Sequence, residues 1–342
     1  MTRGAPGNDQ AMRDQDTPAS ESAVGEVGLE EVSRLANLIT TNVSSVILGK
    51  KDVIESCLIA LLAGGHVIIE DYPGVGKTLL AKALARSVGG RFSRVQFTPD
   101  LLPSDITGIN VFDQRDMRFE FHPGPVFANV VLADEINRAS PKTQASLLEC
   151  MEEGQATIDN VAHRIALPFM ILATQNPIEY EGTYPLPEAQ LDRFMLRLRL
   201  GYPSPEAEAA ILDSQTSGDP YARLEPVVQV ADVLALQQSV LGVRVAPELR
   251  RYVVALMTAT RDHRDIYLGA SPRAGIALLR AAKALAVLRG RDYVVPQDVK
   301  DLGQRTLSHR IILTADAGTR AGAEEDVVAG ILEAVPVPGP GR

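Results

Sequence analysis

The stretch "IIEDYPGVGKTLLAKAL", residues 68–84, decides the fold. An apolar run leads into a loop with two glycines, and a helix-like pattern begins at Lys77. This order of strand, loop and helix is typical of a P-loop, whose usual pattern is G-x-x-x-x-G-K-[ST]. Gly76, Lys77 and Thr78 match the end of that pattern, but Asp71 stands in place of its first glycine. The sequence therefore raises the question of whether an acidic residue at this position spoils a phosphate site.

The intact part of this loop has the chemistry of phosphate binding. Backbone N–H groups converge at the start of a helix, where the helix dipole adds attraction for an anion. Gly74 and Gly76 allow a close backbone approach, while Lys77 can reach terminal phosphates. Thr78 can hold Mg²⁺. We expect Asp71 to point away from the nucleotide and to accept from loop N–H groups. The alternative to a phosphate-binding loop is an ordinary glycine turn between strand and helix.

Composition and charge restrict the remaining possibilities. The 342 residues predict two domains, and the net charge of −9 argues against broad, sequence-independent binding of nucleic acid. Cys57 and Cys150 lie in apolar helical patterns and are expected to be buried thiols, so the cysteines predict neither a disulfide framework nor a metal site of their own. The longest apolar run is too short and too broken for membrane insertion, and the N-terminus lacks an apolar signal-peptide segment. We therefore expect a cytoplasmic protein.

The chain divides into an α/β part and a helical part. Residues 1–27 are polar and are predicted to be disordered. Residues 28–201 carry short apolar runs typical of a parallel sheet covered on both faces: "HVIIED", "RVQF", "NVVLAD" and "FMILAT". In "FMLRLRLGYP" leucines alternate with arginines, which predicts an edge strand. Residues 202–334 are predicted to form an all-α domain, and residues 335–342 an extended Pro/Gly-rich tail.

Acidic and amide side chains follow two of the predicted strands. Asp134 and Glu135 end "NVVLADE", and Asn176 follows "FMILATQ". In an open α/β sheet these positions lie at the carboxyl edge, beside the P-loop. Asp134 can bind Mg²⁺, largely through water, and Glu135 can polarise an attacking water. Asn176 can orient that water or contact a γ-phosphate, although a turn-forming Asn before proline is the alternative.

Two arginines suit contact with phosphate. Arg193, in "PEAQLDRF", precedes the edge strand, and Arg273 opens a helix in "GASPRAGIALL". An arginine that reaches the γ-phosphate of a neighbouring subunit stabilises charge in the transition state. Arg138, just after the acidic pair, is a second candidate for such a contact across a subunit boundary.

Together these features resemble an AAA+ ATPase. The segments "FTPDLLPSDITG", "FHPGPVFANVVLADEINRASPKTQASLLECMEEGQ" and "YPLPEAQLDRF" are similar to blocks of the MoxR family, in the helicase and chelatase branch of AAA+ proteins, and the resemblance covers roughly residues 30–335. It implies a P-loop core with a parallel five-stranded sheet flanked by helices, plus a small all-α lid. It also implies four catalytic roles: Glu135 as base, Asn176 as sensor 1, Arg193 as arginine finger and Arg273 as sensor 2.

The resemblance further implies ATP and Mg²⁺ as cofactors. Thr78 and Asp134 would serve the metal. The residues expected to hold ATP are Gly49 on the adenine side and, in the loop, Pro73, Gly74, Val75, Gly76, Lys77, Thr78 and Leu79. ATP would lie at the interfaces of a homo-oligomeric ring, commonly a hexamer, which would couple turnover to assembly. Whether Arg273 acts on the nucleotide of its own subunit or of a neighbour stays open.

Two predicted hairpins, at about residues 108–124 and 155–167, would face the pore or a partner in such a ring, or form structural flaps. The resemblance implies a chaperone-like ATPase that remodels or matures client proteins or inserts a cofactor into them, with a separate partner that carries a von Willebrand factor A domain. A chelatase subunit, a nucleic-acid motor and a nucleotide-locked scaffold are the alternatives. Because the hairpins mix acidic with basic residues, they argue against a nucleic-acid motor.

Overall fold

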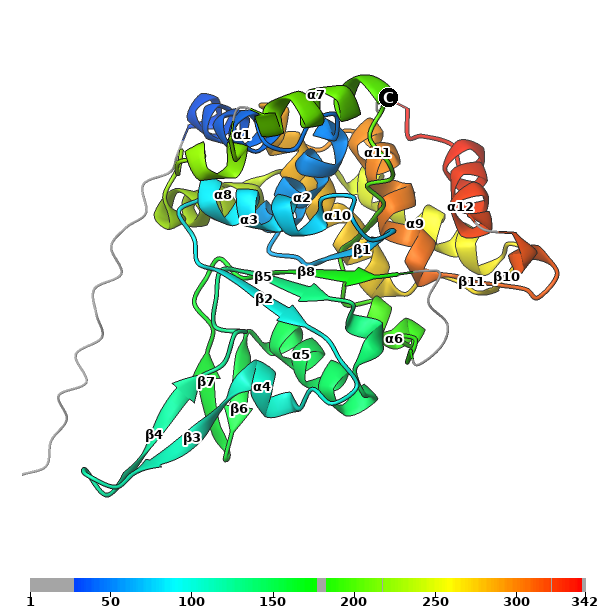
Figure 1. The fold of residues 1–342 in the computed structure, drawn as a ribbon. Coiled ribbons are helices and arrows are strands. Elements are labelled where there is room, and N and C mark those ends of the chain that lie inside the picture. Colours follow the sequence, from blue (N-terminus) through cyan, green and yellow to red (C-terminus); the bar gives the residue numbers. More distant parts are fainter. Residues whose placement is uncertain (1–27, 177–182, 217, 321, 340–342) are drawn as a thin grey trace, which may run out of the picture.

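The computed structural model of the protein describes residues 28–176, 183–216, 218–320 and 322–339. Within them, an α/β core and a helical lid pack together (Figure 1). The core comprises, in chain order, α1 (Leu29–Ser44), α2 (Lys51–Leu62), β1 (Val67–Glu70), α3 (Lys77–Ser87), β2 (Phe92–Gln96), α4 (Pro103–Thr107), β3 (Gly108–Asp113), β4 (Arg118–Pro123), β5 (Val130–Asp134), α5 (Pro141–Glu153), β6 (Gln155–Ile158), β7 (Val161–Arg164), β8 (Met170–Gln175), α6 (Glu188–Leu191) and β9 (Leu196–Leu198). The predicted disordered segment 1–27 lies outside the described residues.

The five strands of the main sheet run parallel in the order β2-β5-β8-β1-β9. The register sets Ile69 of β1 opposite Thr174 of β8, and Ala133 of β5 opposite Ala173 of β8. The loop after β1 and the ends of β5 and β8 therefore emerge at one edge of the sheet, as the sequence predicts. The predicted edge strand is confirmed, because β9 lies at the end of the sheet beside β1.

Alternate residues of the strands enter two separate apolar layers. Val67 and Ile69 of β1 pack with α1, α2 and α3, whereas Ile68 between them packs with α5. All three are fully buried. Figure 1 shows α1–α3 on one face of the sheet and α4–α6 on the other. The continuous apolar runs of the sequence thus reflect strands that are covered on both faces.

Local sequence signals set the helix starts. Ser140 caps α5, because its hydroxyl accepts from the Thr143 N–H and Pro141 occupies the first helical position. Pro205 likewise opens the first lid helix, with Ser204 Oγ accepting from the Ala207 N–H at 3.3 Å. These starts agree with the predicted helices.

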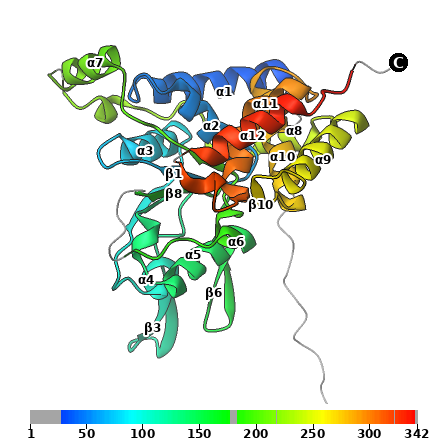
Figure 2. The same ribbon diagram turned by 90° about the vertical axis from the view of Figure 1, so that its right-hand side faces the viewer.

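Two antiparallel hairpins project from the core on the side of α5 (Figure 2). The β3–β4 hairpin follows α4, and the β6–β7 hairpin follows α5. They touch each other, because Asn110 donates to Asp159 at 2.8 Å and the rings of Phe121 and His163 stack at 3.8 Å. The side chain of Phe119 on the first hairpin is 71% exposed. The two hairpins therefore form one projecting unit with apolar side chains in solvent.

The lid continues one of the two apolar layers, so core and lid share a buried cluster. Its elements are α7 (Pro205–Thr216), α8 (Val230–Gly242), α9 (Pro247–Arg261), β10 (Ile266–Leu268), α10 (Pro272–Leu288), α11 (Pro296–Leu307), β11 (Ile312–Leu313) and α12 (Ala323–Ala334). The short antiparallel ribbon β10–β11 is an addition to the helical lid that the sequence did not predict. Across the described ranges, no helix has the length and apolar character needed to span a bilayer.

Candidate nucleotide cavity and arginine pocket

The loop between β1 and α3 bounds a cavity at the carboxyl edge of the sheet. The backbone has φ of +84° at Gly74 and +97° at Gly76, a region that glycine adopts without penalty. Helix α3 begins directly afterwards at Lys77, so its first N–H groups have no intrahelical partners. The cavity measures about 390 Å³ and is lined by Pro73, Gly74, Gly76, Lys77, Thr78, Leu79, Arg94, Asp134, Glu135, Thr174 and Asn176. We call it the nucleotide cavity.

Asp71 faces backbone N–H groups, as predicted from the sequence. Its carboxylate is 4% exposed and accepts from the N–H groups of Tyr72 at 2.9 Å and Gly201 at 2.6 Å. Asp71 is absent from the described lining of the nucleotide cavity. The acidic residue therefore fastens the start of the loop to the segment that leads into the lid.

Lys77 bends back along its own loop. Its ammonium donates to the carbonyls of Asp71 at 2.7 Å and Tyr72 at 3.0 Å. Burial lowers the pKa of Lys77 from its usual value, while the charges of Asp71, Asp134 and Glu135 oppose that shift. The side chain is thus a partly buried cation that lines the cavity, and its positive charge suits a polyphosphate.

Asp134 ends β5 with both carboxylate oxygens engaged. Oδ1 accepts from Thr174 Oγ1 at 2.6 Å, and Oδ2 accepts from Arg94 Nη2 at 2.7 Å. The hydroxyl of Thr78 lines the same cavity. A hydroxyl and a carboxylate are oxygen donors of the kind Mg²⁺ takes with phosphates and water. The side chains fit the predicted metal, although the Arg94 contact favours coordination of Asp134 through water.

Glu135 has an unusual backbone conformation that aims its side chain. Its φ of 57° lies in the left-handed region, and its N–H donates to Thr174 Oγ1 at 2.9 Å. The carboxylate accepts from Gln96 Nε2 at 2.9 Å and from Arg138 Nη1 at 2.8 Å. Strained positions of this type cost about 1–3 kcal/mol and concentrate at functional sites. Arg138 is therefore engaged within its own chain, with the proposed base.

Asn176, just after β8, is 8% exposed and lines the nucleotide cavity. Two of the predicted nucleotide residues, Val75 and Gly49, are absent from the described lining. Gly49 lies in the turn between α1 and α2 with a φ of +73°, and a Cβ there would come within 2.9 Å of the Cβ of Ala207 on α7. The backbone conformation and the packing against the lid therefore explain why position 49 is a glycine.

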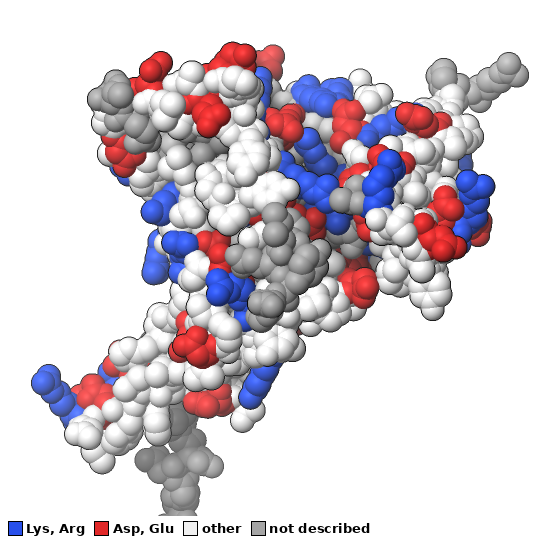
Figure 3. Space-filling model, turned by 45° about the vertical axis from the view of Figure 1, so that its right-hand side comes forward, with Lys and Arg blue, Asp and Glu red and all other residues white. Residues whose placement is uncertain are grey.

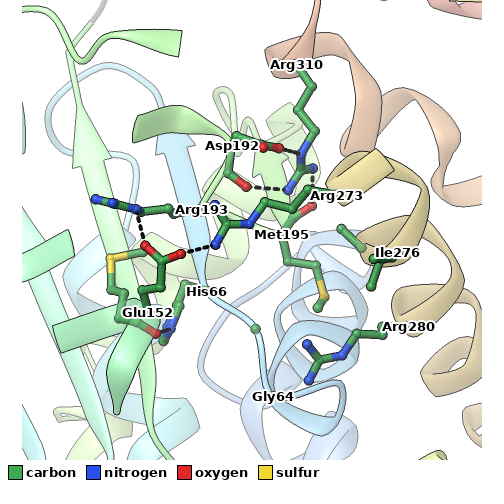
Figure 4. A pocket seen from close by; sticks show the side chains of 13 residues that line it. Gly64, His66, Glu152, Asp192, Arg193, Met195, Arg273, Ile276, Arg280 and Arg310 are labelled. Atoms are coloured by element: carbon green, nitrogen blue, oxygen red, sulfur yellow. Dashed lines mark hydrogen bonds and ion pairs between the residues drawn. The ribbon is translucent and has the colours of Figure 1, made fainter. Parts of the chain in front are cut away.

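Arg193 and Arg273 meet in a different place. They line a pocket of about 300 Å³ between core and lid, which also includes Gly64, Gly65, His66, Met151, Glu152, Asp192, Met195, Ile276, Ala277, Arg280 and Arg310. Glu152 contacts both arginines, at 3.0 Å from Arg193 Nε and at 2.5 Å from Arg273 Nη2. Figure 4 shows the two guanidinium groups approaching that carboxylate from opposite sides. We call this the arginine pocket.

Buried ionic contacts fix the arginine pocket at the joint between core and lid. Arg310, whose side chain is 2% exposed, pairs with Asp192 at 2.6 Å. It also donates to the backbone carbonyls of Asp192, Phe194, Met195 and Thr306. Ser271, which caps the helix of Arg273, donates to Asp192 at 3.4 Å. Asp192 thus ties the segment of Arg193 to the helix of Arg273.

The described linings of the arginine pocket and the nucleotide cavity share no residue. Of the residues predicted to be catalytic, Glu135 and Asn176 lie at the nucleotide cavity, whereas Arg193 and Arg273 lie together in the arginine pocket. The structure therefore divides the predicted site in two.

Comparisons with known proteins agree with this architecture. Residues 66–196 match the family described as "ATPase family associated with various cellular activities (AAA)", and residues 258–331 match the AAA lid domain. The chain is 43% identical to "Chaperone MoxR1" of Mycobacterium tuberculosis, over 94% of this chain and 88% of that protein. It is 34% identical to "Protein MoxR" of Paracoccus denitrificans, over 86% and 94%. The chain belongs to the MoxR family of AAA+ ATPases.

Two further proteins match this chain over nearly their whole length. The "Uncharacterized protein YeaC" of Bacillus subtilis is 49% identical over 90% of this chain and 97% of its own length. A crystal structure described as a candidate ATPase from Cytophaga hutchinsonii superposes with a TM-score of 0.85 and 38% identity, covering 91% of this chain and 97% of that one. The AAA+ core with a helical lid is therefore confirmed as the fold of this MoxR-family chain.

Several contacts at both places were missed by the sequence reasoning. Arg94 and Gln96 alternate along "RVQF", next to the strand that ends at Asp134, and this polar alternation was an available signal. Thr174 stands two residues before Asn176, and this alternation of polar residues along the strand was a similar signal. Glu152 and Arg310 carried no local signal, because their partners lie far away in the sequence.

Proposed function

We propose that this chain is a MoxR-type ring ATPase that hydrolyses ATP to ADP and phosphate and uses the energy to remodel or mature client proteins. The observation that carries the proposal is the division of one catalytic set between two places on the chain. The nucleotide cavity holds the groups for binding and water activation. The arginine pocket holds the cations that such a reaction needs against the γ-phosphate.

At the nucleotide cavity, the loop N–H groups and Lys77 bind the phosphates of ATP. Mg²⁺, held by Thr78 and through water by Asp134, would neutralise phosphate charge when it is bound. Glu135 then accepts the proton of the attacking water, and Asn176 orients that water toward the γ-phosphate. Gln96 and Arg138 hold the Glu135 carboxylate in place, so the base has a defined position before the substrate arrives.

At the arginine pocket, Arg193 and Arg273 supply positive charge to the nucleotide of a neighbouring subunit. Their placement away from the cavity of the same chain supports this assignment. A head-to-tail contact between copies generates a ring when the rotation between them closes, and the family resemblance favours a hexamer. Arg193 is the stronger candidate for the finger, since Arg138 is paired with Glu135 beside the cavity.

The hairpins support a protein client rather than a nucleic acid. Phe112 and Phe119 pack against each other on β3–β4 and are 43% and 71% exposed. Figure 3 shows basic and acidic side chains interspersed over the face drawn, and the projecting part carries both signs of charge. A pore that tracks nucleic acid needs a basic lining, so hairpins with mixed charge and exposed apolar side chains favour contact with polypeptide.

A partner with a von Willebrand factor A domain remains part of the proposal through the family resemblance, and so does insertion of a cofactor into the client. The chelatase-subunit alternative has the same ATPase core, but magnesium-chelatase subunits are only distant relatives of this chain, whereas the MoxR proteins match it over most of their length. The family assignment therefore favours the chaperone-like function.

A Glu135→Gln variant tests this function. The amide cannot accept the proton of water, so ATP should still bind while turnover falls at least about a hundredfold. Affinity purification of that variant with Mg²⁺ and ATP should retain client and partner proteins, with Lys77→Ala as the control that lacks nucleotide. Undiminished turnover in Glu135→Gln would remove Glu135 as the base, and absence of ATP hydrolysis by the wild type would refute the function.

A further inference from the structure

Glu152 stands at the centre of the arginine pocket and has no role in the reaction derived above. It lies in the last turn of α5, two residues before the C-cap Gly154. Its carboxylate is 35% exposed and contacts two cations from different parts of the fold. Arg193 comes from the segment between α6 and β9, whereas Arg273 comes from the first turn of lid helix α10.

The orientation of the contacts leaves the arginines available to a ligand. Arg193 meets Glu152 through Nε, and the outer end of its guanidinium group, formed by the two terminal nitrogens, points away from this contact (Figure 4). In the described part of the chain, Glu152 is the ion-pair partner of Arg193. Arg273 uses one terminal nitrogen, Nη2, and keeps its other N–H groups. A carboxylate that blocked the pocket would instead occupy the outward nitrogens of both arginines, as a phosphate would.

The stability of helix α5 does not by itself explain why position 152 is a glutamate. An acidic residue in the last turn of a helix is disfavoured by the helix dipole, and the last turn of α5 contains no basic residue to compensate. The hydrogen bond from Arg273, with the charge of Arg193, lowers the pKa of Glu152 and keeps it ionised. Without this carboxylate, two neighbouring guanidinium groups would repel each other. Two positive charges against one negative charge still leave a net positive group for an anion.

We propose that Glu152 is a positioning residue for the ATPase reaction, which holds Arg193 and Arg273 together in the geometry that receives the γ-phosphate of a neighbouring subunit. Glu152 contacts no nucleotide itself. It lowers the repulsion between the arginines and orders their side chains, which are 28% and 47% exposed. Less side-chain entropy is then lost when the transition state forms. This inference rests on the proposed function, because it presupposes hydrolysis at subunit interfaces.

The test compares Glu152→Gln with Glu153→Gln, which removes an equal charge from the neighbouring exposed residue on the same helix. Steady-state ATP hydrolysis gives kcat, and a fluorescent ATP analogue gives the Kd of dilute subunits. We expect Glu152→Gln to lower kcat about tenfold, with an unchanged Kd, since only the arginines supplied to the neighbour are disturbed. Glu153→Gln should stay within about twofold of the wild type in both quantities.

A double-mutant cycle with Arg273→Ala separates positioning from a general structural effect. In the Arg273→Ala background, Glu152→Gln should cost clearly less than about tenfold, because one of its two partners is already gone. A full tenfold further loss, an unchanged kcat or an increased kcat in Glu152→Gln would each overturn the inference. If the wild type hydrolyses no ATP, the proposed function itself fails, which is a distinct result.

Discussion

The nucleotide cavity and the arginine pocket are built in opposite ways. The cavity arises from segments that leave one edge of a parallel sheet, so its side chains gather wherever the strands lie in register. The arginine pocket joins α5, the end of α6, the start of α10 and the residues around Arg310. The first is a property of the core, whereas the second exists only when the lid is docked. Nucleotide binding should therefore tolerate changes at the joint that turnover does not.

Lys77→Ala is expected to have the largest effect. Loss of the ammonium removes the only lysine at the described lining of the cavity, so nucleotide binding should be abolished. Lys142→Ala, at an exposed position of α5, is the matched control and should bind normally. Equilibrium titration with a fluorescent ATP analogue measures both. Retained affinity in Lys77→Ala would remove the P-loop from the account.

Arg310→Met should come next, as a loss of stability. Removal of the guanidinium leaves Asp192 and several backbone carbonyls without their buried donor, which costs about 3–5 kcal/mol of unfolding free energy. Arg320→Met breaks an exposed pair with Asp326 and should cost less than about 1 kcal/mol. Urea unfolding decides between them. Equal stability of the two variants would mean that Arg310 does not hold the joint.

A smaller effect is expected from pH at the floor of the arginine pocket. His66 accepts from the Ile171 N–H through Nδ1 and contacts the Met151 carbonyl through Nε2, and burial lowers its pKa to about 4. Because the unfolded chain takes up this proton more readily, the stabilisation is present above pH 6.5 and is lost as pH falls toward 4. It amounts to about 1–3 kcal/mol.

Thermal unfolding between pH 6.5 and 4 measures this contribution. His66→Asn should reduce the fall in stability with falling pH, but not remove it. Part of the fall should stay because burial also lowers the pKa of His309. His122→Asn, at an exposed site, should leave the slope unchanged. An unaltered slope in His66→Asn would show that His66 titrates alike in both states.

Asp71→Gly should have the smallest effect and addresses the unusual loop directly. The carboxylate serves Tyr72 and Gly201 and is absent from the described cavity lining, so nucleotide affinity should change by no more than a few-fold, or about 1 kcal/mol. The same titration as for Lys77→Ala provides the value. Strongly tightened binding would instead identify Asp71 as a repulsive element.

The sequence predicted those features whose cause is local. The strands, the P-loop turn and the caps at Ser140 and Ser204 follow from residues a few positions apart, and the main sheet and its edge strand are confirmed. The convergence of Asp134 and Asn176 beside the loop followed from the rule that ligands sit at the carboxyl edge of parallel strands.

The arginine pocket was beyond that reasoning for a physical reason. Motifs singled out Arg193 and Arg273 separately. The carboxylate that they share, Glu152, lies 41 residues before Arg193 and 121 residues before Arg273 in the chain. Arg310 lies in a short 3-10 turn after α11 and is buried among backbone carbonyls, a setting for which the local sequence carried no signal. Contacts across a domain joint depend on how the lid docks, which residue patterns within one helix do not encode.

The most direct test mixes two inactive variants. Lys77→Ala keeps the arginine pocket but lacks a working nucleotide cavity, and Arg193→Ala has the reverse defect. If neighbouring copies complete each site, a one-to-one mixture should regain about a quarter of wild-type ATP hydrolysis, since about one interface in four pairs an intact cavity with an intact pocket. Activity of the mixture no greater than the sum of the separate variants would contradict this account, because it would mean that each chain completes its own site.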